Sequence, residues 1–123
     1  VLRGRDLRRG SLGVGFSGRT SAGGIKRLVP AIIDAGGIFY RNASGALSLA
    51  YVAAGKLLGY VEEHMNAWDC LAGQLMVAEA GGVVEDQDAS DMVARGGRVI
   101  VATPEAWDEV LAISEAAYAP GQG

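Results

Sequence analysis

The feature that most constrains the fold is a regular alternation of short strand-like runs and helical segments, with glycines between them. Apolar residues recur at helical spacing over about 20–35, 42–54, 68–80 and 103–117. Short apolar runs predict strands over 11–16, 38–41, 57–62, 83–84 and 98–102. Glycines at 36–37, 55 and 81–82 follow three of the helical segments and act as stop signals. This order predicts the α/β class, with helices layered on a mixed β-sheet.

Several residues mark where the helices begin. Thr20 or Ser21 precedes the first helix, and Asn42 or Ser44 precedes the second. Thr103 precedes the last, with proline at the first helical position. Pro30 lies inside the first helix and predicts a kink or a break there. Residues 85–97 are polar and acidic and are expected to form a loop, as are residues 64–67.

Length and composition indicate one soluble globular unit. The 123 residues can form a single α/β domain, with a basic segment over 1–10 and a frayed tail over 118–123. No apolar run is long enough to cross a bilayer, and no leader is visible, so we expect a cytoplasmic protein without a membrane partner. The single cysteine, Cys70, excludes an internal disulfide framework.

Charge is unevenly distributed along the chain. Residues 1–41 carry eight lysines and arginines against two acids, whereas the remainder carries three against twelve. A basic arm can bind nucleic acid, or it can line a solvated surface or meet an acidic one. Because no aromatic residues are interleaved with the arginines to stack on bases, we expect no nucleic-acid partner.

Three glycines suggest one alternative function. Gly13, Gly15 and Gly18 have the G-x-G-x-x-G spacing of dinucleotide-binding turns. In those turns, however, the glycines follow a buried strand, whereas here they fall inside the predicted strand. A nucleotide-binding module is therefore the least favoured of the functions considered.

Two carboxylates and one helix start are the candidate site residues from the pattern alone. Asp69 stands at a helix start, where it can cap the helix or face a cleft as an oxygen ligand for Mg²⁺. Glu62 ends a predicted strand seven residues earlier and could face the same cleft. Ser44 and Gly45 begin a helix with small side chains, which leaves backbone N–H groups open to a ligand, although Ser44 can also be an ordinary cap.

Taken together, three segments resemble the inositol monophosphatase family. They are Ala43-Ser-Gly-Ala-Leu-Ser-Leu-Ala-Tyr-Val-Ala-Ala-Gly55, Gly59-Tyr-Val-Glu62, and the run Trp68-Asp-Cys-Leu-Ala-Gly followed by Glu79-Ala-Gly-Gly82. The third is similar to the family's carboxyl-terminal signature. The resemblance reaches from about residue 10 to the last helix and matches only the second half of a usual member.

The resemblance implies a role for each matched position. Asp69 matches a family aspartate that binds a catalytic Mg²⁺, and Glu62 matches an acid that contacts substrate hydroxyls. Ala43, Ser44 and Gly45 stand where the family has a substrate-contacting Gly-Ser/Thr-Ala. Two departures concern the substrate, because Ser48 stands where many members carry Asp or Asn, and Tyr40 where Arg is common.

The resemblance also implies an activity. Members hydrolyse phosphomonoesters with Mg²⁺, so the expected substrate is a small phosphorylated polyol or sugar, and phosphatidylinositol phosphate biosynthesis is an expected context. The other metal ligands and the water-activating threonine belong to the family's first half, so no catalytic residue is expected in these 123 residues. Related enzymes are often dimers, which predicts a homodimer. The alternative is a non-catalytic interaction or regulatory member of the family.

Overall fold

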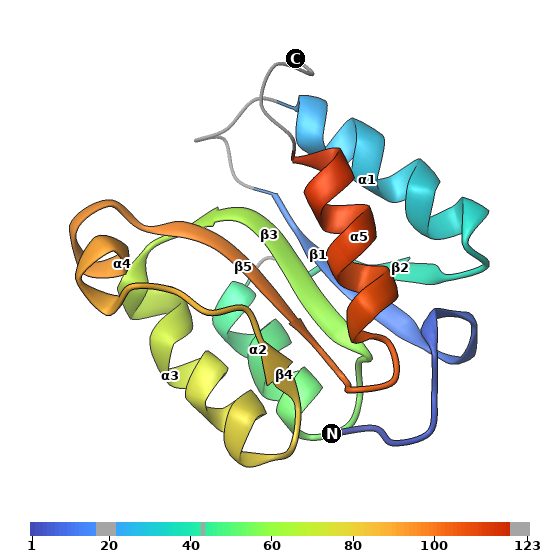
Figure 1. Cartoon of the computed structure of the whole chain (residues 1–123), viewed down its shortest axis with the longest axis horizontal. Coiled ribbons are helices and arrows are strands. Elements are labelled where there is room, and N and C mark those ends of the chain that lie inside the picture. Colours follow the sequence, from blue (N-terminus) through green and yellow to red (C-terminus); the bar gives the residue numbers. More distant parts are fainter. Residues whose placement is uncertain (17–21, 43, 119–123) are drawn as a thin grey trace.

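A computed structural model describes residues 1–16, 22–42 and 44–118, which pack around one sheet. They form a five-stranded sheet with the order β2-β1-β3-β5-β4 (Figure 1). The strands are Ser11–Gly15 (β1), Ile38–Tyr40 (β2), Gly59–Met65 (β3), Val83–Val84 (β4) and Gly97–Ala102 (β5). β1 runs parallel to β2 and β3, whereas β5 runs antiparallel to β3 and β4. The predicted α/β class with a mixed sheet is confirmed.

Helices cover both faces of this sheet (Figure 1). The helices are Gly23–Asp34 (α1), Gly45–Ala53 (α2), Ala67–Glu79 (α3), Ala89–Arg95 (α4) and Trp107–Ala117 (α5). α1 and α5 pack together over one buried core, and α2 and α3 pack together over a second. Within the described ranges, none of the helices has the length and apolar character needed to span a membrane.

The two cores are separated by the alternation of side chains along each strand. In β3, Tyr60 belongs to the core beneath α2 and α3, and its neighbour Val61 belongs to the core beneath α1 and α5. In β1, Val14 also packs beneath α1 and α5, so Gly15 faces the α2 and α3 side next to Tyr60. The glycines of β1 therefore leave space on the face where α2 and α3 lie.

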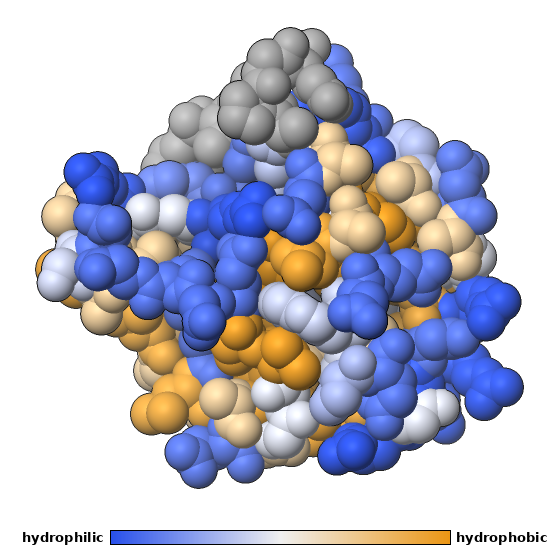
Figure 2. All heavy atoms as spheres, viewed as in Figure 1, coloured by the Kyte–Doolittle hydropathy of each residue, from blue (hydrophilic) through white to orange (hydrophobic). Residues whose placement is uncertain are grey.

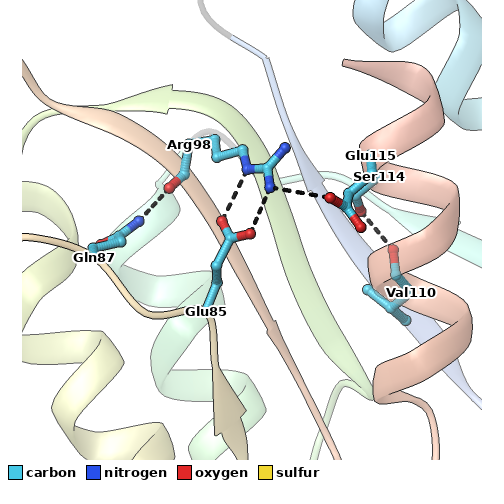
Figure 3. Close-up of polar contacts among 6 residues, drawn as sticks. All are labelled: Glu85, Gln87, Arg98, Val110, Ser114 and Glu115. Carbon is cyan, nitrogen blue, oxygen red and sulfur yellow. Dashed lines mark hydrogen bonds and ion pairs between the residues drawn. The ribbon is translucent and has the colours of Figure 1, made fainter. Parts of the chain in front are cut away.

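A polar network joins β5 to its neighbours (Figure 3). The Arg98 guanidinium donates to both carboxylate oxygens of Glu85, at 2.9 and 2.6 Å, and lies 3.8 Å from the Glu115 carboxylate of α5. Gln87 donates its side-chain amide to the Arg98 carbonyl and accepts a hydrogen bond from Gln74 of α3 at 3.1 Å. These contacts hold the segment after β4 against both the sheet and α3.

Two helices begin at other residues than the pattern predicted. α3 begins at Ala67 with Asn66 in the cap position, so it starts before Asp69. α5 begins at Trp107, and the predicted cap Thr103 is wrong. The Thr103 N–H donates to the Leu58 carbonyl at 2.8 Å, so the chain is still extended beside β3 at this point and turns afterwards.

The polar segment after β4 contains a short helix that the pattern did not predict. The Asp88 carboxylate caps α4 by accepting from the Asp91 N–H at 3.0 Å, and Gly96, with φ of 69°, follows the last turn. β3 also extends through Met65, into residues expected to form a loop. α1 continues through Pro30. The predicted first cap (Thr20 or Ser21) and residues 119–123 of the predicted frayed tail lie outside the described residues.

Arginines of the basic segment make contacts within the chain. Arg3 pairs with Glu105 at 3.3 Å, and Arg8 pairs with Asp6 at 2.8 Å. The hydrogen bond from Arg8 holds the pKa of the Asp6 carboxyl below its usual value. Arg27 donates to the Ala117 carbonyl at 2.8 Å, which ties α1 to the end of α5. Part of the positive charge is thus used to hold elements together.

Candidate functional site

A pocket of about 310 Å³ opens where β1, β3 and the starts of α2 and α3 meet. β1 and β3 are parallel and pair Gly15 with Glu62, so their carboxyl ends lie at the same edge of the sheet. Open α/β sheets bind ligands at this edge. The pocket is lined by Gly15, Phe16, Asn42, Ser44, Gly45, Ala46, Tyr60, Glu62, Met65 and Asp69.

Four of the five residues singled out from the sequence line this pocket together. Ser44 and Gly45 come from the start of α2, Glu62 from β3 and Asp69 from the first turn of α3. Ala43 lies outside the described residues. The structure thus brings the candidates to one place, and their roles toward substrate and metal stay predictions.

The start of α2 is held by side-chain hydrogen bonds. The Ser44 hydroxyl accepts from the Leu47 N–H at 3.1 Å, so the interpretation of Ser44 as a helix cap is confirmed. The Ser44 N–H in turn donates to the Asn42 side-chain oxygen at 2.9 Å. Gly45 and Ala46 follow, with first-turn N–H groups that have no partner in the preceding turn of helix. Such N–H groups favour anions and ligand oxygens at this side of the pocket.

Two departures from the family pattern have structural consequences. Ser48 is buried and donates its hydroxyl to the Ser44 carbonyl at 3.1 Å, so it supports the first turn of α2 and does not line the pocket. Tyr40 ends β2, and its hydroxyl accepts from the Asn42 side-chain amide at 3.3 Å. Tyr40 thus contacts Asn42, a residue that lines the pocket, but does not line it itself.

Glu62 is nearly buried and has a tyrosine as its partner. Glu62 is 8% exposed, and its Oε1 accepts a hydrogen bond from the Tyr60 hydroxyl at 2.5 Å. Burial raises the pKa of Tyr60 above its usual range, and the hydrogen bond and negative charge of Glu62 raise it further. Tyr60 therefore remains protonated at neutral pH and donates to the carboxylate.

Asp69 does not cap its helix. It occupies the third position of α3, and its own N–H donates to the carbonyl of Asn66, which holds the cap position. The interpretation of Asp69 as a helix cap is therefore wrong, and Asp69 lines the pocket instead. Among the described residues no hydrogen bond or ion pair to its carboxylate is formed, so its oxygens are available to a ligand.

Glycines at two positions make room for the Tyr60–Glu62 pair. A Cβ at Gly15 would overlap the Tyr60 hydroxyl and lie 2.7 Å from Cδ of Glu62. A Cβ at Gly45 would lie 3.2 Å from the same hydroxyl and 3.4 Å from Oε1 of Glu62. The pair therefore excludes a side chain at Gly15, whereas a Cβ at Gly45 would overlap mainly the end of the flexible Met65 side chain, at 2.5 Å.

The same argument accounts for the glycine spacing in β1. A Cβ at Gly13 would lie 3.0 Å from the Tyr60 ring and 3.1 Å from Leu57. Gly13 and Gly15 therefore face packed side chains, and α1 begins only at Gly23. Gly18, the third glycine of the G-x-G-x-x-G spacing, lies outside the described residues. The described residues thus explain Gly13 and Gly15 by packing, without a nucleotide turn.

The acidic residues of the pocket suit a hard cation but form only part of a site. Glu62 and Asp69 offer carboxylate oxygens, the ligands that Mg²⁺ prefers. Across residues 1–16, 22–42 and 44–118, no group of three or more His, Cys, Asp or Glu side chains is arranged to hold a metal. Further ligands would have to come from elsewhere.

Two other reactive side chains near the pocket, His64 and Cys70, have structural surroundings. His64 makes a 2.8 Å hydrogen bond between Nε2 and the Arg95 carbonyl, which joins β3 to the end of α4. Cys70 is fully buried, and burial, followed by the charges of Asp69 and Glu62, raises the pKa of its thiol to about 11. Cys70 is therefore an apolar core residue rather than a nucleophile.

Sequence reasoning missed Tyr60 as a residue of this site. Tyr60 precedes Glu62 by two residues, so the two side chains share one face of β3. That spacing was visible once the strand was placed. The predicted strand over 57–62 contained both residues, but spacing alone does not show that the tyrosine hydroxyl turns toward the carboxylate, so the pairing was not predicted.

Comparison with known proteins gives a consistent result. The chain matches the model of the inositol monophosphatase family over residues 17–117. It is 36% identical over 112 residues to "Inositol-1-monophosphatase" of Mycobacterium leprae, covering 87% of this chain and 37% of that protein. It is 43% identical over 84 residues to "Nus factor SuhB" of Haemophilus influenzae, covering 68% of this chain and 32% of that protein.

Solved structures share the fold. The structure of Mycobacterium tuberculosis SuhB superimposes with a TM-score of 0.77 and 33% identity, covering 99% of this chain and 46% of that one. The chain thus spans about a third of the curated relatives and just under half of this solved chain.

Proposed function

Because the chain belongs to the inositol monophosphatase family, we propose that it forms the substrate-side part of a site that hydrolyses a small phosphomonoester. The substrate class is an inositol phosphate, a sugar phosphate or a related phosphorylated polyol. The observation that carries this proposal is the single pocket that joins the start of α2, Glu62 and Asp69. We also propose that the complete protein is a homodimer, as the resemblance implies, and that it is cytoplasmic.

Each wall of the pocket offers a different kind of contact to such a substrate. The first-turn N–H groups at Gly45 and Ala46 donate to ligand oxygens, and Ser44 holds that turn in place. The Glu62 carboxylate accepts hydrogen bonds from hydroxyl groups of the polyol. Ala43, next in the chain to Ser44, completes the proposed substrate-contacting set.

We propose Mg²⁺ as the cofactor, with Asp69 as the ligand that these residues provide. Bound Mg²⁺ polarises a phosphoryl oxygen and lowers the pKa of the attacking water. Asp69 suits this role because its carboxylate lines the pocket without a partner among the described residues. Since the described residues hold no group of three metal-ligating side chains, the other ligands are expected from residues outside them.

Phosphate release by the complete product of the encoding gene tests this proposal. It is assayed on inositol 1-phosphate, sugar phosphates and p-nitrophenyl phosphate, with and without Mg²⁺. We expect Mg²⁺-dependent turnover and at least a tenfold loss of kcat in Asp69→Asn, because the amide keeps the shape and removes the charge. Asp108→Asn is the matched control, since Asp108 is an exposed acid in the first turn of α5, across the sheet from the pocket.

The outcomes separate the possibilities. No turnover of any phosphomonoester would exclude the phosphatase function, and an unchanged rate in Asp69→Asn would exclude Asp69 as a metal ligand. Loss of activity in Asp108→Asn as well would indicate a general effect of charge or folding.

A non-catalytic regulatory role is the second candidate. It is favoured by the relatives named "Nus factor SuhB", with which the chain shares 40 to 44% identity over their matched residues. The two candidates are distinguished by Asp69→Asn in cells that depend on the gene. A phosphatase role predicts loss of function there, whereas a regulatory role predicts full complementation.

A further inference from the structure

Tyr60 lines the pocket, and its hydroxyl contacts Glu62, the proposed acceptor for substrate hydroxyl groups. Tyr60 is 1% exposed, and its hydroxyl donates to Oε1 of Glu62 at 2.5 Å. No other hydrogen bond to the Glu62 carboxylate is formed by the residues that the structure describes. A carboxylate has about four acceptor positions. One oxygen is therefore engaged by the protein, and Oε2 is left for a ligand.

The surroundings of the pair allow little movement. The Tyr60 ring packs in the core beneath α2 and α3, next to Gly13 of β1. Gly15 lies against both the hydroxyl and the carboxylate, and a Cβ at that position would displace them, while Gly45 contacts the pair at 3.2 and 3.4 Å. The flexible Glu62 side chain is thus held by a buried hydrogen bond from the Tyr60 side chain.

We propose that Tyr60 is a positioning residue, which sets the orientation of the Glu62 carboxylate and thereby the preference of the pocket for substrates with a correctly placed hydroxyl. This inference rests on the proposed function. Fixing an acceptor before the ligand arrives lowers the conformational cost of binding. The orientation matters only to a substrate that contacts Glu62, so the effect depends on the alcohol part of the ester and not on its phosphate.

Tyr60→Phe tests the proposal, because it keeps the buried ring and removes the hydroxyl. In the complete gene product, kcat and KM are measured for inositol 1-phosphate and for p-nitrophenyl phosphate, whose aryl group has no aliphatic hydroxyl. We expect kcat/KM for inositol 1-phosphate divided by kcat/KM for p-nitrophenyl phosphate to fall at least fivefold, mainly because KM for inositol 1-phosphate rises. The ratio does not depend on the fraction of folded protein, so a partial folding defect cannot produce this result.

Two further variants separate positioning from packing. Tyr51→Phe is the matched control, since Tyr51 is on α2 and does not line the pocket, and its ratio should equal that of the wild type. Glu62→Gln should lower the ratio as well. Adding Tyr60→Phe to Glu62→Gln should change it by less than about twofold, because Tyr60 acts through the carboxylate.

Three outcomes would overturn the inference, and they differ from failure of the proposed function. An unchanged ratio in Tyr60→Phe, or additive effects in the double variant, would exclude positioning through Glu62 and leave the phosphatase function intact. Turnover of p-nitrophenyl phosphate in the wild type without turnover of inositol 1-phosphate or of any sugar phosphate would exclude the polyol preference. If the wild type hydrolyses none of the inositol, sugar and aryl phosphates, the proposed function fails and this inference fails with it.

Discussion

Gly59 lies in the middle of the sheet, where β3 pairs with both β1 and β5. Its position differs from that of Gly15 and Gly45, whose missing side chains leave room for movable side-chain atoms. A Cβ at Gly59 would overlap the carbonyl oxygen of Val101 and lie 3.1 Å from Cα of Ala102. Both atoms are backbone, so neither can move without disturbing the β3–β5 pairing.

We predict that Gly59→Ala lowers the free energy of unfolding by about 2 to 3 kcal/mol, which is typical of overpacking in a rigid core. Urea denaturation followed by circular dichroism measures the change. Gly97→Ala in β5 is the control, because a Cβ there meets only the Met92 sulfur at 3.0 Å, in a side chain that can rotate. Equal stability of Gly59→Ala and the wild type would contradict this account of the sheet.

At the scale of elements, the periodicity of apolar residues predicted those helices and strands that bury a large apolar face. The five strands and four of the helices were expected near their observed positions. Most of them present several buried side chains at regular spacing, whereas β2 is exposed and β4 is two partly buried residues, and both were found from short apolar runs next to glycines. α4 was missed because it is seven residues long and buries only Met92, which gives no periodicity. Its signals were local: Asp88 as a cap three residues before Asp91, and Gly96 after its last turn.

The candidate site divides in the same way. Residues that a motif carries, such as Ser44, Glu62 and Asp69, were identified from the sequence and lie together in the fold. Tyr60 depends on which face of β3 each residue takes, and Asn42 depends on hydrogen bonds to Ser44 and Tyr40. Each of these contacts joins residues two positions apart in the chain, but that spacing does not show which side chains turn toward one another, so the sequence did not specify the contacts.

The polar network around Arg98 gives a prediction for one connection (Figure 3). Glu85 accepts two hydrogen bonds from Arg98, and their side chains are 19% and 35% exposed. We expect Glu85→Gln to lower the free energy of unfolding by about 1 kcal/mol, since a bidentate, partly shielded pair is lost. Asp91→Asn, which breaks the exposed pair between Asp91 and Arg95 in α4, should cost about 0.3 kcal/mol.

Urea denaturation at low and high salt measures both changes. The Asp91 effect should shrink at high salt, because exposed charges are screened, whereas most of the Glu85 effect should persist. Equal effects for the two variants would mean that the Arg98 network contributes no more than an ordinary surface pair.

At the scale of the whole molecule, the described residues form two buried cores and also leave large apolar side chains at the surface. Apolar side chains reach the surface over α3 (Figure 2), where Trp68 and Leu75 are 78% and 61% exposed. β2 lies at an edge of the sheet, and Ile38 there is 66% exposed. A solved relative with the same fold is more than twice as long, since this chain covers 46% of it.

The acidic groups give the last prediction. The pocket has two carboxylates, and one of them is engaged by Tyr60, whereas an Mg²⁺ ion takes six oxygen ligands in octahedral geometry. We therefore expect the 123-residue chain alone to release no phosphate from inositol 1-phosphate or p-nitrophenyl phosphate above the buffer rate, with or without Mg²⁺. Circular dichroism and a cooperative urea transition first establish that the chain is folded.

The same chain joined to the preceding part of the Mycobacterium leprae relative should show Mg²⁺-dependent turnover that Asp69→Asn removes. Turnover by the lone chain that is lost in Asp69→Asn would instead mean that these residues hold a complete catalytic site.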